Sequence, residues 1–108
     1  MAGKNQTELT IATIRLFISL NAQIACHESD GGFKEYVIGD SKTVRYSVGF
    51  NRSTNKYEIC IDSNVICSET DNTLVGREIK KLYDEMAAAY GNQMTHSRLQ
   101  NNRYDHAI

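Results

Sequence analysis

The sequence predicts a single α+β domain in which two helices flank an antiparallel sheet. Three observations support this prediction. An apolar stretch of helical length lies near the N-terminus, short runs rich in Val, Ile, Tyr and Phe fill the middle of the chain, and an apolar stripe with helical spacing follows them. The chain has 108 residues, 41% of them hydrophobic, and no proline, which suits one modest core. We expect residues 1–92 to form this domain and residues 93–108 to be a polar C-terminal extension or a short helix.

The first helix is predicted over residues 7–25, because their apolar positions fit no strand-like alternation and the segment is long for a strand. At about 100° per residue the polar side chains gather in one wedge, which leaves an apolar arc of roughly 200°, about twice the width that packing on a sheet requires. Two explanations stay open. Either the helix lies between the sheet and a second helix, or part of the arc joins two copies of the chain in a homodimer. Residues 27–32 are polar, end in two glycines and are expected to stop the helix.

Four strand-like runs separated by turn residues predict an antiparallel meander of three or four strands. In the second run, large apolar side chains occupy every second position from Val44 to Phe50, so one sheet face is expected to be core and the other open. The third run repeats this alternation. The runs are 33–38, 43–50, 56–61 and 65–69, and the turns between them are 39–41, 51–55 and 62–64.

The second helix is predicted over residues 74–90, where apolar residues recur at spacings of three and four. This stripe is typical of an amphipathic helix that packs on one face of a sheet. One of residues 71–73 can cap its start, and Gly91 with Asn92 offers a left-handed stop.

No motif in the sequence indicates enzymatic chemistry, so we expect a protein without catalytic residues, cofactor or bound metal. The three cysteines suggest a metal site at first. The predicted hairpin pairs Ile61 with Val65, however, and places Ile59 opposite Cys67. Cys60 then points to the other face of the sheet, which argues against a shared metal and against a disulfide. The thiols are therefore expected to be structural.

The chain is expected to be cytoplasmic. Residues 9–26 are apolar enough for a secretory signal, but Glu8, Arg15 and Gln23 are charged or polar where such a signal is not. The run is also too short and too polar to span a bilayer, so no membrane contact is expected. Three cysteines cannot form a closed disulfide set, which fits a reducing compartment. His96 and His106 lie in the polar tail and are expected to be solvated.

Charge placement indicates a recognition surface, although the net charge of -1 excludes a strongly basic nucleic-acid binder. Residues 42–57 carry four cations and no acid, whereas residues 58–76 carry four acids and no base. An exposed basic hairpin can contact an acidic protein surface or phosphates. The alternative is a solvated face whose cations pair with the acidic strand. The candidate partner-binding residues are Lys42, Arg45, Arg52 and Lys56, with Arg77, Lys80 and Lys81 at the start of the second helix as secondary candidates.

Arg77, Lys80 and Lys81 follow the strands directly, and the order helix, strands, helix resembles in topology the double-stranded-RNA-binding domain. In that family a basic start of the last helix grips phosphates. The same order resembles small phage-encoded inhibitors, including some anti-CRISPR proteins, which bind one target and perform no chemistry. We therefore expect a small non-enzymatic protein that acts by protein–protein interaction, such as a phage or mobile-element inhibitor of a host system. The alternative is an RNA- or DNA-binding module that uses the basic hairpin and the start of the second helix.

Overall fold

The computed structural model describes residues 2–39 and 42–106, with side chains for residues 6–39 and 42–96. Consecutive strands are neighbours and every pair is antiparallel, so the five-stranded sheet is a meander of order β1-β2-β3-β4-β5. The predicted α+β class is confirmed, with five strands in place of three or four. The elements are α1 (Ala2–Ser19), β1 (Ile24–Glu28), β2 (Phe33–Ile38), β3 (Tyr46–Asn51), β4 (Lys56–Ile61), β5 (Asn64–Thr70) and α2 (Leu74–His106).

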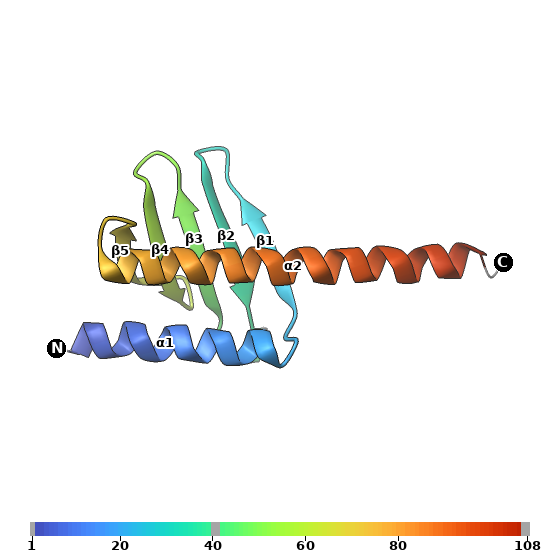
Figure 1. Cartoon of the computed structure of the whole chain (residues 1–108), viewed down its shortest axis with the longest axis horizontal. Coiled ribbons are helices and arrows are strands. Elements are labelled where there is room, and N and C mark those ends of the chain that lie inside the picture. The colour runs from blue at the N-terminus through green and yellow to red at the C-terminus, as the bar shows by residue number, and fades with distance from the viewer. Residues whose placement is uncertain (1, 40–41, 107–108) are drawn as a thin grey trace.

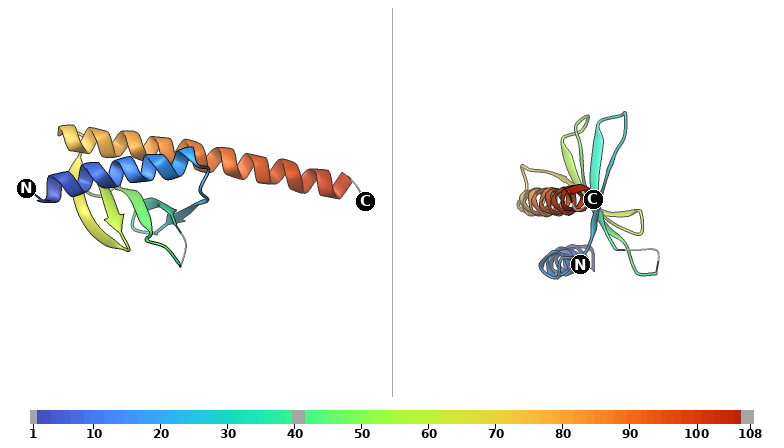
Figure 2. Two further views of the ribbon diagram at one scale, coloured as in Figure 1. Left: turned by 90° about the horizontal axis from the view of Figure 1, so that it is seen from below. Right: turned by 90° about the vertical axis from the view of Figure 1, so that its right-hand side faces the viewer.

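Both helices lie on one face of the sheet (Figure 1, Figure 2). α2 crosses the strands and contacts all five of them, while α1 lies beside α2 and contacts β5. α2 also continues well past β1, so the molecule is 58 Å long. The opposite face of the sheet has no helix over it among the described residues, as the strand alternation predicts.

The core lies between the covered face of the sheet and the two helices. Every second residue of β3 and β4 points toward the helices, which confirms the predicted inward face. Val44, which the alternation assigns to the core, is 44% exposed because β3 begins only at Tyr46. The predicted turn at residues 39–41 lies partly outside the described residues. The largest fully buried side chains are Ile14, Ile38, Val48, Ile59, Ile79, Leu82 and Met86.

α1 ends at Ser19, earlier than the sequence predicts, and Ile24 and Ala25, the last two residues of the predicted helix, begin an additional strand, β1. Asn21 has a φ of 59°, a left-handed conformation that asparagine adopts more readily than most residues. The Ala22 N–H donates to the Phe17 carbonyl at 3.0 Å and so closes the end of the helix. β1 then pairs with β2 along its whole length, which places His27 and Glu28 in a strand rather than in the predicted loop.

The start of α2 lies where the sequence predicts it. The Gly76 N–H donates to the Thr73 hydroxyl at 2.9 Å, so Thr73 is the N-cap. A Cβ on Gly76 would lie only 1.7 Å from the Thr70 carbonyl oxygen. The first turn of α2 therefore approaches the end of β5 as closely as only glycine permits.

The predicted stop of α2 at Gly91 and Asn92 is wrong. Gly91 is not in the left-handed conformation, and the helix continues through it to the end of the described residues. Gln93 ties this part of the helix to the start of β1. Its Oε1 atom accepts a hydrogen bond from the Ile24 N–H and its Nε2 atom donates one to the Ala22 carbonyl, both at 2.9 Å. Residues 93–106 are thus a continuation of α2 rather than a separate extension.

Candidate functional site

The four cations of the predicted basic hairpin lie at two opposite ends of the sheet. Arg45 precedes β3 and Arg52 follows it, so they are separated by about 23 Å along the strand. Lys42 accompanies Arg45 in the connection between β2 and β3, and Lys56 is the first residue of β4, next to the turn that holds Arg52. All four residues are exposed. The structure therefore does not gather them into one surface, contrary to the expectation from the sequence.

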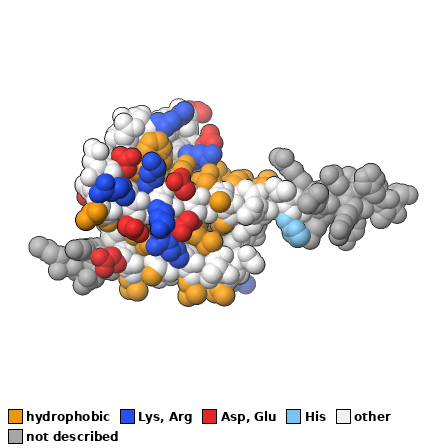
Figure 3. Space-filling model, in the orientation of Figure 1, with side chains coloured by type: hydrophobic (Ala, Val, Ile, Leu, Met, Phe, Trp, Pro, Cys, Tyr) orange, Lys and Arg blue, Asp and Glu red, His pale blue; other side chains and the backbone are white. Residues whose placement is uncertain are grey.

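The secondary candidates Arg77, Lys80 and Lys81 occupy exposed positions in the first turns of α2. The Lys80 ammonium lies 3.6 Å from the Asp71 carboxylate and is partly neutralised by it. On the face shown in Figure 3, Lys and Arg side chains are interspersed with Asp and Glu. A phosphate backbone attracts an extended positive surface, which this mixture does not provide.

The cysteines do not converge on one point. Ile59 lies opposite Cys67, as predicted, so Cys60 points to the open face and Cys67 to the helix side. A β-bulge between Ile59 and Cys60 shifts the rest of this hairpin, and Val65 lies opposite Cys60 rather than opposite Ile61. Burial raises the pKa of all three thiols, which keeps them protonated and weakly nucleophilic near neutral pH. In the described part of the chain, no group of three or more His, Cys, Asp or Glu residues is placed to hold a metal ion.

A groove of about 1040 Å³ opens between α1, β5 and the start of α2. Apolar side chains from all three elements line it, including Ile11 and Ala12 of α1, Ile66 of β5 and Val75 of α2. Leu74, the first residue of α2, also lines the groove and is 78% exposed. Because these residues come from distant parts of the chain, no local sequence pattern reveals the groove.

The charged side chains that line the groove are mostly acidic. Glu8, Glu69 and Glu78 contribute carboxylates to it. The base among its lining residues is Arg15, which lies 3.0 Å from Glu85 and 3.6 Å from Glu78. Glu8 and Glu69 form no ion pair with any residue that the structure describes. The groove therefore combines an apolar lining with an excess of negative charge.

A second apolar feature, the α1 stripe, consists of Leu9 and Leu16 on the outer side of α1 and of Leu20, which follows the last residue of the helix and whose N–H donates to the Leu16 carbonyl. Their exposed fractions are 70%, 56% and 67%. They follow one another at intervals of seven and four residues, which places them along one side of a helix. Thr13, which lies between Leu9 and Leu16, is also uncharged and donates its hydroxyl to the Leu9 carbonyl at 2.8 Å, so the stripe contains no charged side chain. α1 packs against α2 and β5, yet these contacts leave the stripe uncovered.

Neither helix is both long and apolar enough to cross a membrane, over the range of residues that the structure describes. Comparison of this chain with protein-family models, with curated proteins and with solved structures gives no match. The groove and the α1 stripe are therefore the features from which a function can be inferred.

Proposed function

We propose that this protein is a small non-enzymatic binding protein that acts through protein–protein contact, as an inhibitor or an adaptor. The observation that carries the proposal is the groove between α1, β5 and α2, which no described segment of the chain fills. Contiguous apolar surface of this kind marks interaction sites in soluble proteins. A groove with an apolar lining and a charged border suits an amphipathic segment of a partner.

The charge of the groove selects a basic partner segment. Glu8 and Glu69 have no ion-pair partner among the described residues, so lysine or arginine side chains of the partner would gain attraction there. Apolar residues at helical spacing on the same segment would pack on Ile66 and Val75. Arg15 is already paired with Glu78 and Glu85, so its charge does little to offset the attraction of Glu8 and Glu69 for such side chains.

The α1 stripe is assigned to a second copy of this chain. It carries no charge, so its contact with the same stripe of another copy brings no like charges together. The spacing of Leu9, Leu16 and Leu20 suits packing of one helix on another. A two-fold axis through such a seam would bury the stripes of both copies at once.

The proposal places this protein in the cytoplasm, where its three free cysteines would stay reduced. A phage or mobile-element inhibitor of a host system is the narrower form of the same proposal. The identity of the captured target decides whether this narrower form holds.

The test is affinity capture from a lysate of the native host, followed by mass spectrometry. The wild type is compared with a groove variant, Glu8→Lys with Glu69→Lys. The matched control is Asp30→Lys with Asp84→Lys, which changes the net charge equally at exposed positions outside the groove. The wild type and the control should retain a common target that the groove variant loses, because charge reversal repels a basic partner.

A direct measurement accompanies the capture. A synthetic amphipathic peptide of Lys and Leu should bind the wild type in calorimetry, and its counterpart of Glu and Leu should not. Both double variants are melted to show that they remain folded. A target that the groove variant still retains, or equal binding of the two peptides, would contradict the proposal. A target that is lost after nuclease treatment would favour the nucleic-acid alternative instead.

A further inference from the structure

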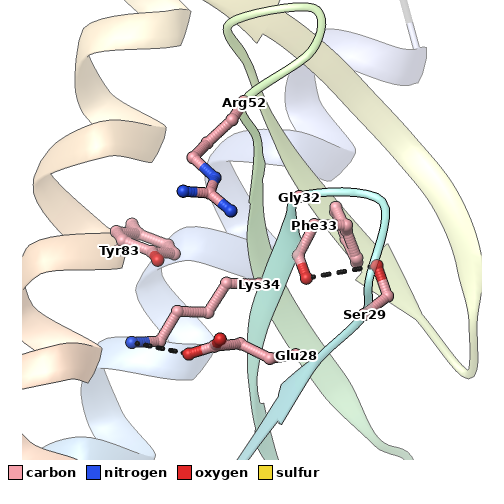
Figure 4. A pocket seen from close by; sticks show the side chains of 7 residues that line it. All are labelled: Glu28, Ser29, Gly32, Phe33, Lys34, Arg52 and Tyr83. Carbon is pink, nitrogen blue, oxygen red and sulfur yellow. Dashed lines mark hydrogen bonds and ion pairs between the residues drawn. The ribbon is translucent and has the colours of Figure 1, made fainter.

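A smaller cleft of about 240 Å³ lies where the β1–β2 turn meets the β3–β4 turn, beside α2. Figure 4 shows that Arg52, Lys34 and Tyr83 reach into it from three different elements. This cleft shares no lining residue with the groove at α1 and β5. It therefore represents a separate site whose properties do not depend on the proposed partner of the groove.

The backbone that carries Arg52 is held in place by the neighbouring turn. The Arg52 N–H donates to the Gly32 carbonyl at 3.1 Å, and the Ser53 hydroxyl donates to the Gly31 carbonyl at 3.3 Å. Gly32 has a φ of 89°, which other residues rarely adopt, and a Cβ there would lie 3.5 Å from the Arg52 Nε atom. The guanidinium thus lies against a turn of defined shape, which reduces the conformational entropy that binding would cost.

The cleft contains one positive charge without a partner. The Lys34 ammonium lies 3.4 Å from the Glu28 carboxylate, so these two charges balance each other. Arg52 forms no ion pair with an acidic side chain in the described part of the chain. An arginine with free donors binds carboxylate or phosphate oxygens in a two-pronged arrangement.

Tyr83 supplies an aromatic wall next to this charge. Its ring is held by edge-on contacts with Tyr36, Phe50 and Tyr57, whose ring centroids lie 5.2, 6.4 and 5.8 Å away. Burial raises the pKa of Tyr83, so its hydroxyl stays a hydrogen-bond donor at neutral pH. A planar group can stack between such a ring and a guanidinium.

We propose that this cleft binds a small organic anion composed of one planar ring and one acidic group, a carboxylate or a phosphate. The acidic group would bind Arg52 and the ring would lie against Tyr83. The volume of about 240 Å³ is smaller than the roughly 300–1,000 Å³ of pockets for drug-sized ligands, so the ligand has about the size of one substituted ring.

The test is an NMR titration of the isotope-labelled full chain with four probes: benzoate, phenyl phosphate, the neutral benzamide and inorganic phosphate. Benzoate or phenyl phosphate should produce saturable shifts at Gly32 and Arg52, with a dissociation constant of about 1 mM or lower. Whichever of benzoate and phenyl phosphate binds more tightly shows whether the site prefers a carboxylate or a phosphate. Benzamide lacks the charge and inorganic phosphate lacks the ring, so each should bind at least about tenfold more weakly than the matching ring-bearing anion.

The variants locate the site. Arg52→Gln should weaken binding of the anion at least about tenfold, because a hydrogen bond to a charged group is lost. Arg45→Gln is the matched control, since Arg45 is also exposed but lies at the other end of β3. It should leave the dissociation constant unchanged.

Three results would overturn the proposal: no saturable shift up to about 10 mM of either anion, equal affinity for benzamide, or equal weakening by both arginine variants. The comparison of the four probes uses the wild-type chain, so it decides the question even if a variant is unstable.

Discussion

Charging the α1 stripe is expected to separate two associated copies of this chain. The stripe leucines, Leu9, Leu16 and Leu20, are 70%, 56% and 67% exposed, so most of each side chain is still available for burial. Complete burial of a leucine contributes about 1.5–3 kcal/mol, so each leucine would contribute about 1–2 kcal/mol at a seam. The leucines of two copies together would supply about 6–12 kcal/mol.

Association has a cost that must be subtracted from this gain. The loss of free motion of two molecules costs at least about 4 kcal/mol. Subtracting this cost from the middle of the 6–12 kcal/mol range leaves a free energy of association of about 5 kcal/mol, which corresponds to a dissociation constant near 0.2 mM. Leu16→Glu removes one leucine from each copy and brings two carboxylates to the seam, so it should cost at least about 3 kcal/mol and weaken association more than about 100-fold.

Sedimentation equilibrium between about 20 µM and 1 mM covers this dissociation constant. The matched control is Val65→Glu, which charges a side chain that is 55% exposed on β5, outside the stripe. Both substitutions are at exposed positions and should change the free energy of unfolding by less than about 0.5 kcal/mol. A wild type that stays monomeric up to about 1 mM would refute the reasoning. So would a Leu16→Glu variant that dimerises as the wild type does, or a Val65→Glu variant that dissociates equally.

Gly76→Ala should lower the free energy of unfolding by more than about 2 kcal/mol, because the added Cβ would lie 1.7 Å from the Thr70 carbonyl oxygen. Urea unfolding measures this change, and an undiminished stability would show that α2 does not approach β5 so closely. Gly91→Ala should raise the same free energy by about 0.5–1 kcal/mol, because the site is helical and, apart from the adjoining residues and the nearby backbone of the same helix, nothing lies within 4 Å of the new Cβ; a decrease would argue that residue 91 is not helical. Burial raises the pKa of Cys60 and of Tyr83 above the unfolded-state values of about 8.5 and 10, so their stabilising contribution is complete below about pH 8 and is lost as pH rises through the folded-state values. Unfolding measured across this alkaline range should show a falling free energy, with a smaller fall in Cys60→Ala, and a loss of stability confined to acidic pH would contradict the assignment.

The elements that the sequence predicts correctly are those whose own periodicity reports how they pack. Ile79, Leu82 and Met86 of α2 recur at helical spacing, and all three are fully buried. The alternation in β3 and β4 likewise reports one buried and one open face, with Val48 opposite Ile59 in the core. Each such pattern arises because one face of the element must leave water, so it can be read without knowing the neighbours.

Elements whose conformation depends on a distant neighbour could not be predicted in this way. Ile24 begins a strand at the edge of the sheet, but its apolar side chain also continues the pattern of the preceding helix. Glycine often ends a helix. At an exposed helical position such as Gly91, however, it lowers the stability of the helix by only about 1 kcal/mol relative to alanine. The two hydrogen bonds that Gln93 forms, as donor to the Ala22 carbonyl and as acceptor from the Ile24 N–H, help to offset that cost, and they exist only in the folded chain.

The same division applies to the candidate sites. The sequence by itself determined the secondary-structure class, the inward faces of the strands and the excess apolar width of α1, because these depend on neighbours within a few residues. Only the tertiary structure decided which charged side chains lie near one another.

Arg45 and Arg52 are close in sequence, but an extended strand rises about 3.3 Å per residue and places them at opposite ends of the sheet. The groove instead brings together Glu8 of α1 and Glu69 of β5, which are far apart in the sequence, because burial of the core packs α1 against β5.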